Sequence, residues 1–256
     1  NSENKVEIED VIKRNRKIKY VLLDENKNIS GNTNEALKLC TGEYIGLLDH
    51  DDILAPFALY EVVKALNEDR RTDVIYSDED KFTTLNGARF QPHFKPDFSP
   101  DYLRSINYIT HFFVLKKSLM DELGGFRDEY NGAQDYDIIL RATEKAEKIV
   151  HIPKILYHWR VHENSTSQDI GAKQYAIDAG KKAIEAHIER KNMPGEVTSL
   201  DGKSIYRVRF AVDDEEKVSI IIPNKDHVDD LKKCINSILS RTTYGNYEII
   251  VVENNS

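Results

Sequence analysis

Three aspartates follow directly on a short apolar run in the first quarter of the chain. The run covers residues 44–48 and has the length and composition of a buried strand, and the acids are Asp49, Asp51 and Asp52. In parallel sheets, ligands bind beyond the carboxyl ends of the strands. Clustered carboxylates repel one another unless a cation or a proton compensates, and oxygen ligands suit Mg²⁺ or Mn²⁺. The pattern predicts an α/β sheet whose edge carries a metal and diphosphate site.

The same acids could instead cap a helix. Asp52 precedes Pro56 and the helical pattern of residues 57–66, and an acidic side chain there can satisfy free N–H groups of the first turn. Taken alone, the cluster fits both interpretations equally well.

The combination of an apolar run and acid occurs twice more. Residues 73–77 precede Asp78-Glu79-Asp80, and residues 248–252 precede Glu253. If the three strands share one sheet, their ends line a single crevice that could hold a charged ligand and its cation. Acidic turns are also common, so any one cluster could be incidental.

Composition limits the class of protein and of partner. The chain has 256 residues, 40% of them hydrophobic and 31% charged, which fits one large α/β domain or one domain with an appendage. The formal net charge of −8 argues against nucleic-acid polymers as partners, because they are bound through Lys and Arg. A single nucleoside diphosphate is not excluded, since a divalent cation can offset its charge.

Two further features indicate a cytoplasmic chain. No apolar run approaches the roughly 18 residues that span a bilayer, and the polar start at residues 1–5 is no signal peptide. Cys40 and Cys234 lie in helical patterns, where buried thiols are commoner than a disulfide or a metal site.

Helical and strand patterns alternate along most of the chain, which is typical of βαβ units. Strands are predicted at 18–23, 44–48, 73–77, 110–115 and 149–159, the last as a pair interrupted by Pro153, and helices at 6–14, 33–39, 56–66, 117–123, 135–145 and 174–190. Residues 81–108 show no period and are predicted to form an ordered loop.

The chain then divides. A hairpin is predicted at 195–212 and a charged linker at 213–217, followed by a strand at 218–222, a helix at 228–239 and a strand at 248–252. We therefore predict three parts: 1–192, 193–217 and 218–256.

Six short segments are informative when they are taken together. They are 218–225 (VSIIIPNK), 249–256 (IIVVENNS), 29–34 (ISGNTN), 48–52 (LDHDD), 132–137 (GAQDYD) and 157–165 (YHWRVHENS). Together they resemble the glycosyltransferase family 2 enzymes, inverting transferases of the GT-A fold that use nucleotide-diphospho-sugars. In that order, they match the family's opening strand, nucleotide-binding acid, small-residue helix start, metal motif, catalytic-base helix and closing segment. The resemblance covers nearly all of the chain.

The resemblance implies a fold and an activity. The fold is a Rossmann-like, mostly parallel sheet flanked by helices, with the hairpin as an appendage. The activity is metal-assisted sugar transfer, with Mn²⁺ or Mg²⁺, from a donor of UDP or dTDP type to a saccharide or lipid-linked saccharide in cell-surface polysaccharide synthesis. The location would be the cytoplasm or the inner face of the membrane.

Site residues follow by matching motifs. The candidate base is Asp135, which from spacing alone is also a helix N-cap or first-turn acid. The expected metal ligands are Asp51, Asp49 and His162, although a histidine after a strand is often only a satisfied polar residue. The predicted nucleotide contacts are Pro223, Asn224, Glu253, Asn34, Asp49 and His50. The predicted acceptor contacts are Asp78, Asp80, His93 and Gln134, with Asp78 and Asp80 equally readily explained as surface acids.

The motif order is cyclic, because the family begins with the segment that stands here at 218–256 and continues with the one at Asn1. A piece of a tandem protein and a circular permutation both explain this order. In either case we predict that 218–256 completes the sheet, in the same chain or by exchange with a second copy, as in a domain-swapped homo-oligomer.

Two departures from the family pattern matter. Thr33 stands where relatives often carry arginine, and the Gln-x-x-Arg-Trp motif of processive synthases is absent. Addition of single sugars is therefore favoured over polymerisation. The alternative function is a non-catalytic, glycosyltransferase-like binding or scaffold module of a tandem protein, against which the presence of Asp51 with Asp135 argues.

Overall fold

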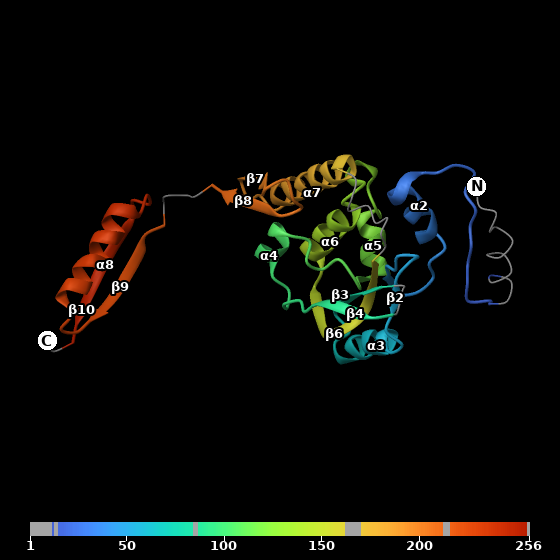
Figure 1. Ribbon diagram of the computed structural model, residues 1–256, viewed down its shortest axis with the longest axis horizontal. Helices are drawn as coiled ribbons and strands as arrows, with labels where there is room; N and C mark the ends of the chain where they lie inside the picture. The colour runs from blue at the N-terminus through green and yellow to red at the C-terminus, as the bar shows by residue number, and fades with distance from the viewer. Residues whose placement is uncertain (1–11, 13–14, 84–86, 162–169, 212–215, 255–256) are drawn as a thin grey trace. The chain divides into compact units, whose positions relative to one another are not determined.

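The computed structural model describes residues 12, 15–83, 87–161, 170–211 and 216–254. The chain forms two compact units, Asn1–Arg209 and Phe210–Ser256, shown in Figure 1. Each is described by itself.

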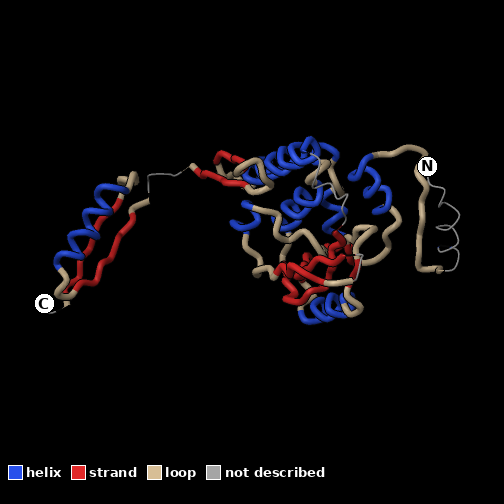
Figure 2. Tube along the Cα trace, in the orientation of Figure 1, coloured by secondary structure: helices blue, strands red, loops and turns tan. Residues whose placement is uncertain are grey.

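A six-stranded sheet forms the centre of the first unit (Figure 2). Its strands are β1 (Tyr44–Gly46), β2 (Ile53–Leu54), β3 (Thr72–Thr83), β4 (Arg89–His93), β5 (Val114–Lys116) and β6 (Lys148–Val161). They lie in the order β1-β5-β3-β6-β2, with β4 paired to β3. This mixed sheet agrees with the predicted α/β class.

The pairing in this sheet is less parallel than the sequence indicates. β3 and β6 are parallel, whereas the four other pairings within this six-stranded sheet are antiparallel. Antiparallel neighbours need no crossover helix. β4 accordingly returns along β3 after a short connection, and β5 returns along β3 and β1.

Helices cover both faces of the sheet (Figure 1). The helices are α2 (Asn28–Leu37), α3 (Ala58–Glu68), α4 (Pro100–Ser105), α5 (Lys117–Leu123), α6 (Gln134–Lys145) and α7 (Ile170–Arg190), with the 3₁₀ turn η1 (Asp128–Tyr130). Successive residues of β3 point to opposite faces. Val74 and Tyr76 pack with Ile138 of α6, and Ile75 packs with Val62 of α3. A side chain buried in this way contributes roughly 1.5–3 kcal/mol.

Three predicted segments differ from the structure. Residues 18–23 pair with no described strand, and Leu22 is 60% exposed, so their backbone lacks the partner that a strand requires. β3 runs on to Thr83, which together with β4 and α4 replaces much of the predicted 81–108 loop. β6 is one strand rather than two, because a register shift after the Ser77–Ile152 pair accommodates Pro153. The predicted helix at 6–14 lies almost wholly outside the described residues.

The predicted hairpin is present. β7 (Gly195–Ser199) and β8 (Tyr206–Phe210) form a two-stranded sheet, and Tyr206 donates a hydrogen bond from its hydroxyl to the carbonyl of Ile177 in α7. The hairpin is therefore anchored to the long helix that packs on α6.

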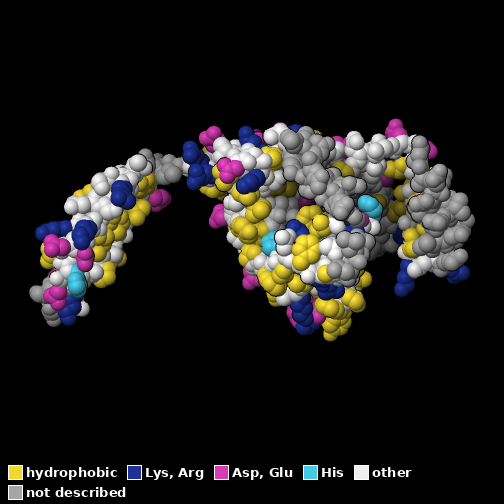
Figure 3. All heavy atoms as spheres, in the orientation of Figure 1, with side chains coloured by type: hydrophobic (Ala, Val, Ile, Leu, Met, Phe, Trp, Pro, Cys, Tyr) yellow, Lys and Arg dark blue, Asp and Glu magenta, His cyan; other side chains and the backbone are white. Residues whose placement is uncertain are grey.

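The second unit is the predicted βαβ segment. β9 (Val218–Asn224) and β10 (Tyr247–Glu253) are parallel and are connected by α8 (Val228–Arg241). None of its described residues is fully buried, and Figure 3 shows apolar side chains along it. Ile221 is 67% exposed and Leu239 59% exposed. Within the described part of the chain, every helix is too short or too polar to traverse a bilayer.

Candidate active site

Two acids and a histidine converge at one edge of the first unit's sheet. Ligand atoms of Asp49, Asp52 and His111 all lie within 4.8 Å of one another, and we call these residues the Asp-Asp-His cluster. The antiparallel pairing of Gly46 with Val114 brings the end of β1 next to the start of β5, which places the acids beside His111. Two carboxylates and an imidazole are a donor set suited to Mn²⁺ and tolerated by Mg²⁺.

The hydroxyl of Tyr157, on β6, holds the two acids of the cluster in place. It donates to Asp52 Oδ2 at 2.5 Å and accepts from the backbone N–H of Asp49 at 3.3 Å. The backbone N–H of Arg160 donates to Asp52 Oδ1 at 2.8 Å. The Tyr157 ring also stacks on His111, with ring centroids 4.5 Å apart. The cluster is thus fixed by groups from a neighbouring strand.

The carboxylates around His111 stabilise a positive charge on its ring. Burial lowers the pKa of His111, but the Asp49 and Glu79 carboxylates raise it by a larger amount, so that the pKa is about 9. His111 Nε2 lies 3.5 Å from Asp49 Oδ2, and this contact lowers the pKa of Asp49. A divalent cation would compete with the imidazole proton for the same carboxylates.

Glu79 supports His111 from the other side. Its Oε2 lies 3.3 Å from His111 Nδ1 and 3.1 Å from Lys95 Nζ, and it accepts a 3.1 Å hydrogen bond from the Thr110 hydroxyl. Burial alone would raise the pKa of Glu79, but the charges of His111, His93 and Lys95 hold it well below its usual range. Glu79 is therefore an ionised carboxylate in the interior.

Asp135 lies in the first turn of α6. The N-cap of that helix is Ala133, so Asp135 is a first-turn acid and not the cap. Asn107 Nδ2 donates to Asp135 Oδ2 at 3.0 Å. Burial raises the pKa of Asp135, the charge of His111 lowers it, and that of Asp49 raises it. The candidate base thus lies within electrostatic reach of the Asp-Asp-His cluster.

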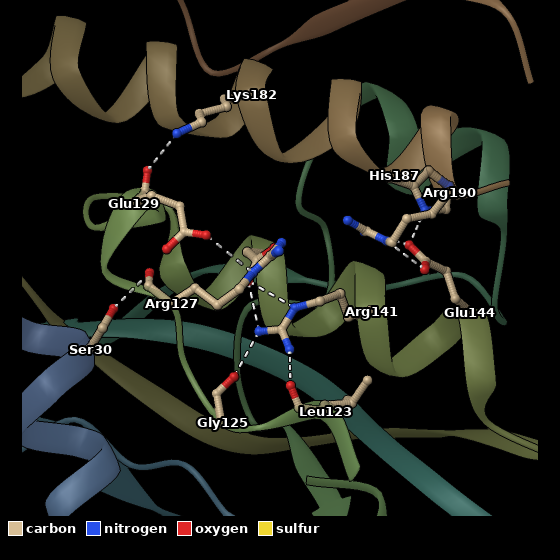
Figure 4. A network of polar contacts seen from close by, with 11 residues as sticks. Ser30, Leu123, Gly125, Arg127, Glu129, Arg141, Glu144, Lys182, His187 and Arg190 are labelled. Carbon is tan, nitrogen blue, oxygen red and sulfur yellow. Dashed lines mark hydrogen bonds and ion pairs between the residues drawn. The ribbon is translucent and has the colours of Figure 1, made fainter. Parts of the chain in front are cut away.

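Asp137, two residues further on, has a different environment. It is fully buried between Arg127 and Arg141, and we call these three residues the arginine network. Figure 4 shows Arg141 also donating to the carbonyls of Leu123 and Gly125, both at 2.8 Å. The network fixes α6 against the loop that precedes it.

The predicted acceptor residues lie partly inside the fold. Asp78 and Asp80 are buried within β3 and pair with His151 at 2.8 Å and His158 at 2.5 Å, so their interpretation as surface acids is wrong. His93 Nδ1 lies 3.6 Å from Glu79 Oε1. Gln134 Oε1 accepts from the N–H of Gly132. Acceptor contact by these residues stays a prediction.

The predicted metal and nucleotide residues of the first unit have mixed surroundings. The ring of His50 is 98% exposed, and its Nδ1 lies 3.9 Å from Asp51 Oδ1. The side chain of Asn34 is bound at both ends to the backbone of Phe126, at 2.8 Å each, which leaves less of it for a ligand. His162 lies outside the described residues.

The predicted nucleotide contacts of the second unit lie at the ends of two adjacent strands. Pro223 and Asn224 close β9, and Glu253 closes β10 and pairs in register with Asn224. Asn224 Nδ2 donates to Glu253 Oε2 at 2.7 Å. A polar pair therefore lies at the carboxyl edge of this sheet.

The predicted metal ligands and contacts omit five residues of this site: Asp52, which takes the place expected of Asp51 in the cluster, His111, Glu79 in its supporting role, Asn107 and Tyr157 with its bridging hydroxyl. His111 carried one signal, a polar side chain directly before the apolar residues 112–115. The others depend on contacts between segments far apart in the sequence, which no local pattern shows.

A family model and known proteins match this chain. The model "Glycosyl transferase family 2" matches residues 2–126 and 219–256. The chain is 41% identical over 245 residues to an uncharacterized protein of Sinorhizobium fredii, spanning 94% of this chain and 27% of that protein. It is 36% identical over 249 residues to the O-antigen biosynthesis protein RfbC of Myxococcus xanthus, spanning 97% of this chain and 19% of that protein.

A solved structure agrees in fold. A mannosyltransferase of Pyrobaculum calidifontis, in complex with GDP-Man and Mn²⁺, superposes with a TM-score of 0.51 at 18% identity, over 72% of this chain and 52% of that one. This likeness confirms the predicted GT-A fold. The chain spans only about a fifth to a quarter of the two curated relatives. Because the family model matches more than half of the sequence, the protein belongs to glycosyl transferase family 2.

Proposed function

We propose that this chain transfers a sugar, with inversion, from a nucleotide-diphospho-sugar to a hydroxyl of a saccharide acceptor in surface polysaccharide synthesis. One observation carries the proposal: Asn107 donates to Asp135 Oδ2 at 3.0 Å and accepts from the N–H of Thr110 at 3.4 Å, and so links the candidate base to the segment that carries His111 of the Asp-Asp-His cluster. The relative from Myxococcus xanthus, named for O-antigen biosynthesis, supports the substrate class.

Asp49, Asp52 and His111 would hold the cation. Their donor set fits Mn²⁺ or Mg²⁺, and Asp49 is exposed, so the cluster is open to a ligand. Asp51 and His162 stay candidate ligands. When bound, the cation would offset the charge that the departing diphosphate gains.

Asp135 would act as the general base. It would take the proton of the acceptor hydroxyl while the hydroxyl oxygen bonds to the anomeric carbon and the bond from that carbon to the diphosphate oxygen breaks. Such a base contributes about 10²–10⁴ in rate. Burial that raises the pKa of Asp135 also makes its carboxylate a stronger base.

The second unit would contribute nucleotide contacts. Asn224 and Glu253, at the carboxyl ends of β9 and β10, offer amide and carboxylate groups that can hydrogen-bond a base and a ribose. Donor preference for UDP or dTDP stays a prediction, as does the assembly of residues 218–256 into a sheet in the same chain or in a swapped pair.

The test combines binding with turnover. UDP, dTDP and GDP are titrated calorimetrically with and without Mn²⁺, and the corresponding donor sugars are incubated with saccharide acceptors. Asp49→Asn should abolish the metal-dependent part of nucleotide binding, and Asp135→Asn should retain binding and lose transfer. The exposed Asp121→Asn is the matched control. Nucleotide binding without transfer by the wild-type chain would favour the scaffold alternative instead.

A further inference from the structure

Glu79 stands out among the acids of β3. It is 8% exposed. The acids of the Asp-Asp-His cluster come from the loop after β1, and β5 lies between β1 and β3, the strand that carries Glu79. Asp78 and Asp80, its neighbours on the strand, pair with His151 and His158 instead. Glu79 is therefore the acid of this run that reaches His111.

The two ring nitrogens of His111 have different carboxylate neighbours. Nε2 lies 3.5 Å from Asp49 Oδ2, inside the cluster, and Nδ1 lies 3.3 Å from Glu79 Oε2, outside it, as an ion-pair contact without hydrogen-bond geometry. A carboxylate next to the second nitrogen of a metal-binding histidine keeps the proton on that nitrogen, fixes the ring orientation and raises the basicity of the coordinating one. Glu79 lies beside that nitrogen, at a distance from which its charge can act on the ring.

Glu79 is itself held rigidly. Lys95 Nζ lies 3.1 Å from its Oε2 and donates to the backbone carbonyl of Ile109 at 2.7 Å and to that of His111. The Lys95 side chain is fully buried. Thr110, between those two carbonyls, donates its hydroxyl to the same Glu79 oxygen. One lysine thus binds both the carboxylate and the backbone that carries the histidine.

We propose that Glu79 is a positioning residue for the cation site, acting through His111, and that Lys95 holds Glu79 and the residue 109–111 backbone in the required arrangement. The inference rests on the proposed function, because it assumes that the cluster binds a divalent cation. It adds a residue that would touch neither cation nor substrate.

The experiment measures the affinity of the whole chain for Mn²⁺ alone, from the loss of the free-ion electron paramagnetic resonance signal. Glu79→Gln keeps the side-chain shape and should weaken Mn²⁺ binding about 10- to 100-fold, as observed for residues that support metal-binding histidines. Glu144→Gln is the matched control. Glu144 also bonds a histidine, with its Oε1 2.6 Å from His187 Nδ1, and it pairs with Arg190. Its variant should bind Mn²⁺ within about twofold of the wild type.

A double-mutant cycle separates positioning from a simple loss of negative charge. If Glu79 acts through His111, Glu79→Gln should have no further effect in a His111→Gln background. An equal loss in both backgrounds would mean that Glu79 acts independently of His111, and would overturn the proposal. Wild-type affinity in a folded Glu79→Gln variant would overturn it as well.

Removing the charge of Glu79 leaves Lys95 buried without its partner, which could unfold the chain. The variant Glu79→Gln/Lys95→Met removes both charges together and should fold, while its Mn²⁺ affinity should still fall about tenfold. Retention of wild-type affinity in this folded variant would contradict the proposal. If the wild-type chain itself binds no Mn²⁺, the cation assignment of the proposed function fails, and this inference fails with it.

Discussion

Asp135 and Asp137 lie two residues apart on α6, in two different electrostatic environments. Asp137 is enclosed by Arg127 and Arg141, which neutralise it and use it to fix the helix. Asp135 accepts from the neutral amide of Asn107 and from backbone N–H groups, and burial raises its pKa. The difference suits the two carboxylates to separate roles: the arginine network fixes the helix, and Asp135, which has no such network, is the acid that we propose for proton transfer.

The largest expected effect is on catalysis. Asp135→Asn should lower kcat by about 10²–10⁴. Its free energy of unfolding should change by less than about 1 kcal/mol, because Asp135 has no partner of opposite charge in direct contact among its described hydrogen bonds. Turnover of the donor sugar and urea denaturation measure the two quantities. A large loss of stability with kcat retained would assign Asp135 to the structural side of the comparison.

Asp137→Asn should show the reverse. It leaves Arg127 and Arg141 without a buried counter-charge, which costs about 3–5 kcal/mol in the free energy of unfolding. Urea denaturation is the measurement. Asp121→Asn, which breaks the exposed pair with Lys117, should cost at most about 1 kcal/mol. A stability equal to the wild type would show that the arginine network contributes little to folding.

A smaller effect sharpens the role of Asn107. Its hydrogen bond favours the ionised form of Asp135, so Asn107→Ala should lower kcat/KM about tenfold, equivalent to a bond of about 1.5 kcal/mol to a charged group. A base must be ionised, so kcat/KM should fall as the pH drops through the pKa of Asp135, which lies above the ordinary 3.8. In Asn107→Ala this acid limb should move to higher pH. An unmoved limb in the pH–rate profile would exclude this role.

The smallest effect concerns acid stability. Burial raises the pKa of Glu144, but Arg190 and His187 lower it by a larger amount, so the pKa in the folded state lies below the ordinary 4.5. The pair therefore contributes stability that is full above about pH 4.5 and is lost as the pH falls through the lower, folded value. Glu144→Gln should flatten the loss of stability in this window, as followed by thermal melting at several pH values. An unchanged slope would show that other carboxylates determine it.

The sequence predicted the class of fold and the acids at its edge, because apolar runs and acidic turns are local patterns. Asp49 follows from such a pattern. Asp135 became the candidate base only through the family resemblance, because spacing alone also fits a helix N-cap or a first-turn acid. The place of the acid run Asp78-Glu79-Asp80 was not predicted, because β3 continues through it instead of ending before it. Asp78 and Asp80 pair with histidines of β6, and Glu79 pairs with His111, which precedes β5. His111 joins the cluster through strand pairing, which depends on register and not on neighbouring residues.

The second unit shows the opposite limit. Its strands and helix were predicted correctly, since the period of the apolar residues is clear, yet none of its described residues is fully buried. Local patterns predicted its helix and strands. They do not show what its exposed apolar side chains would pack against, because such a contact is not a local property.

The hydroxyl of Tyr157, on β6, donates to the carboxylate of Asp52 and accepts from the backbone N–H of Asp49, and thereby fixes one carboxylate of the cluster and the backbone that carries the other. Ca²⁺ takes six to eight oxygens at roughly 2.3–2.6 Å and requires ligands that can spread around it, whereas Mg²⁺ is held closer, by fewer protein groups and several waters. If the cluster holds a cation as proposed, the fixed carboxylate of Asp52 leaves less freedom to spread ligands, and we expect Ca²⁺ to substitute poorly for Mn²⁺. Tyr157 would in this way limit which ion the proposed site accepts.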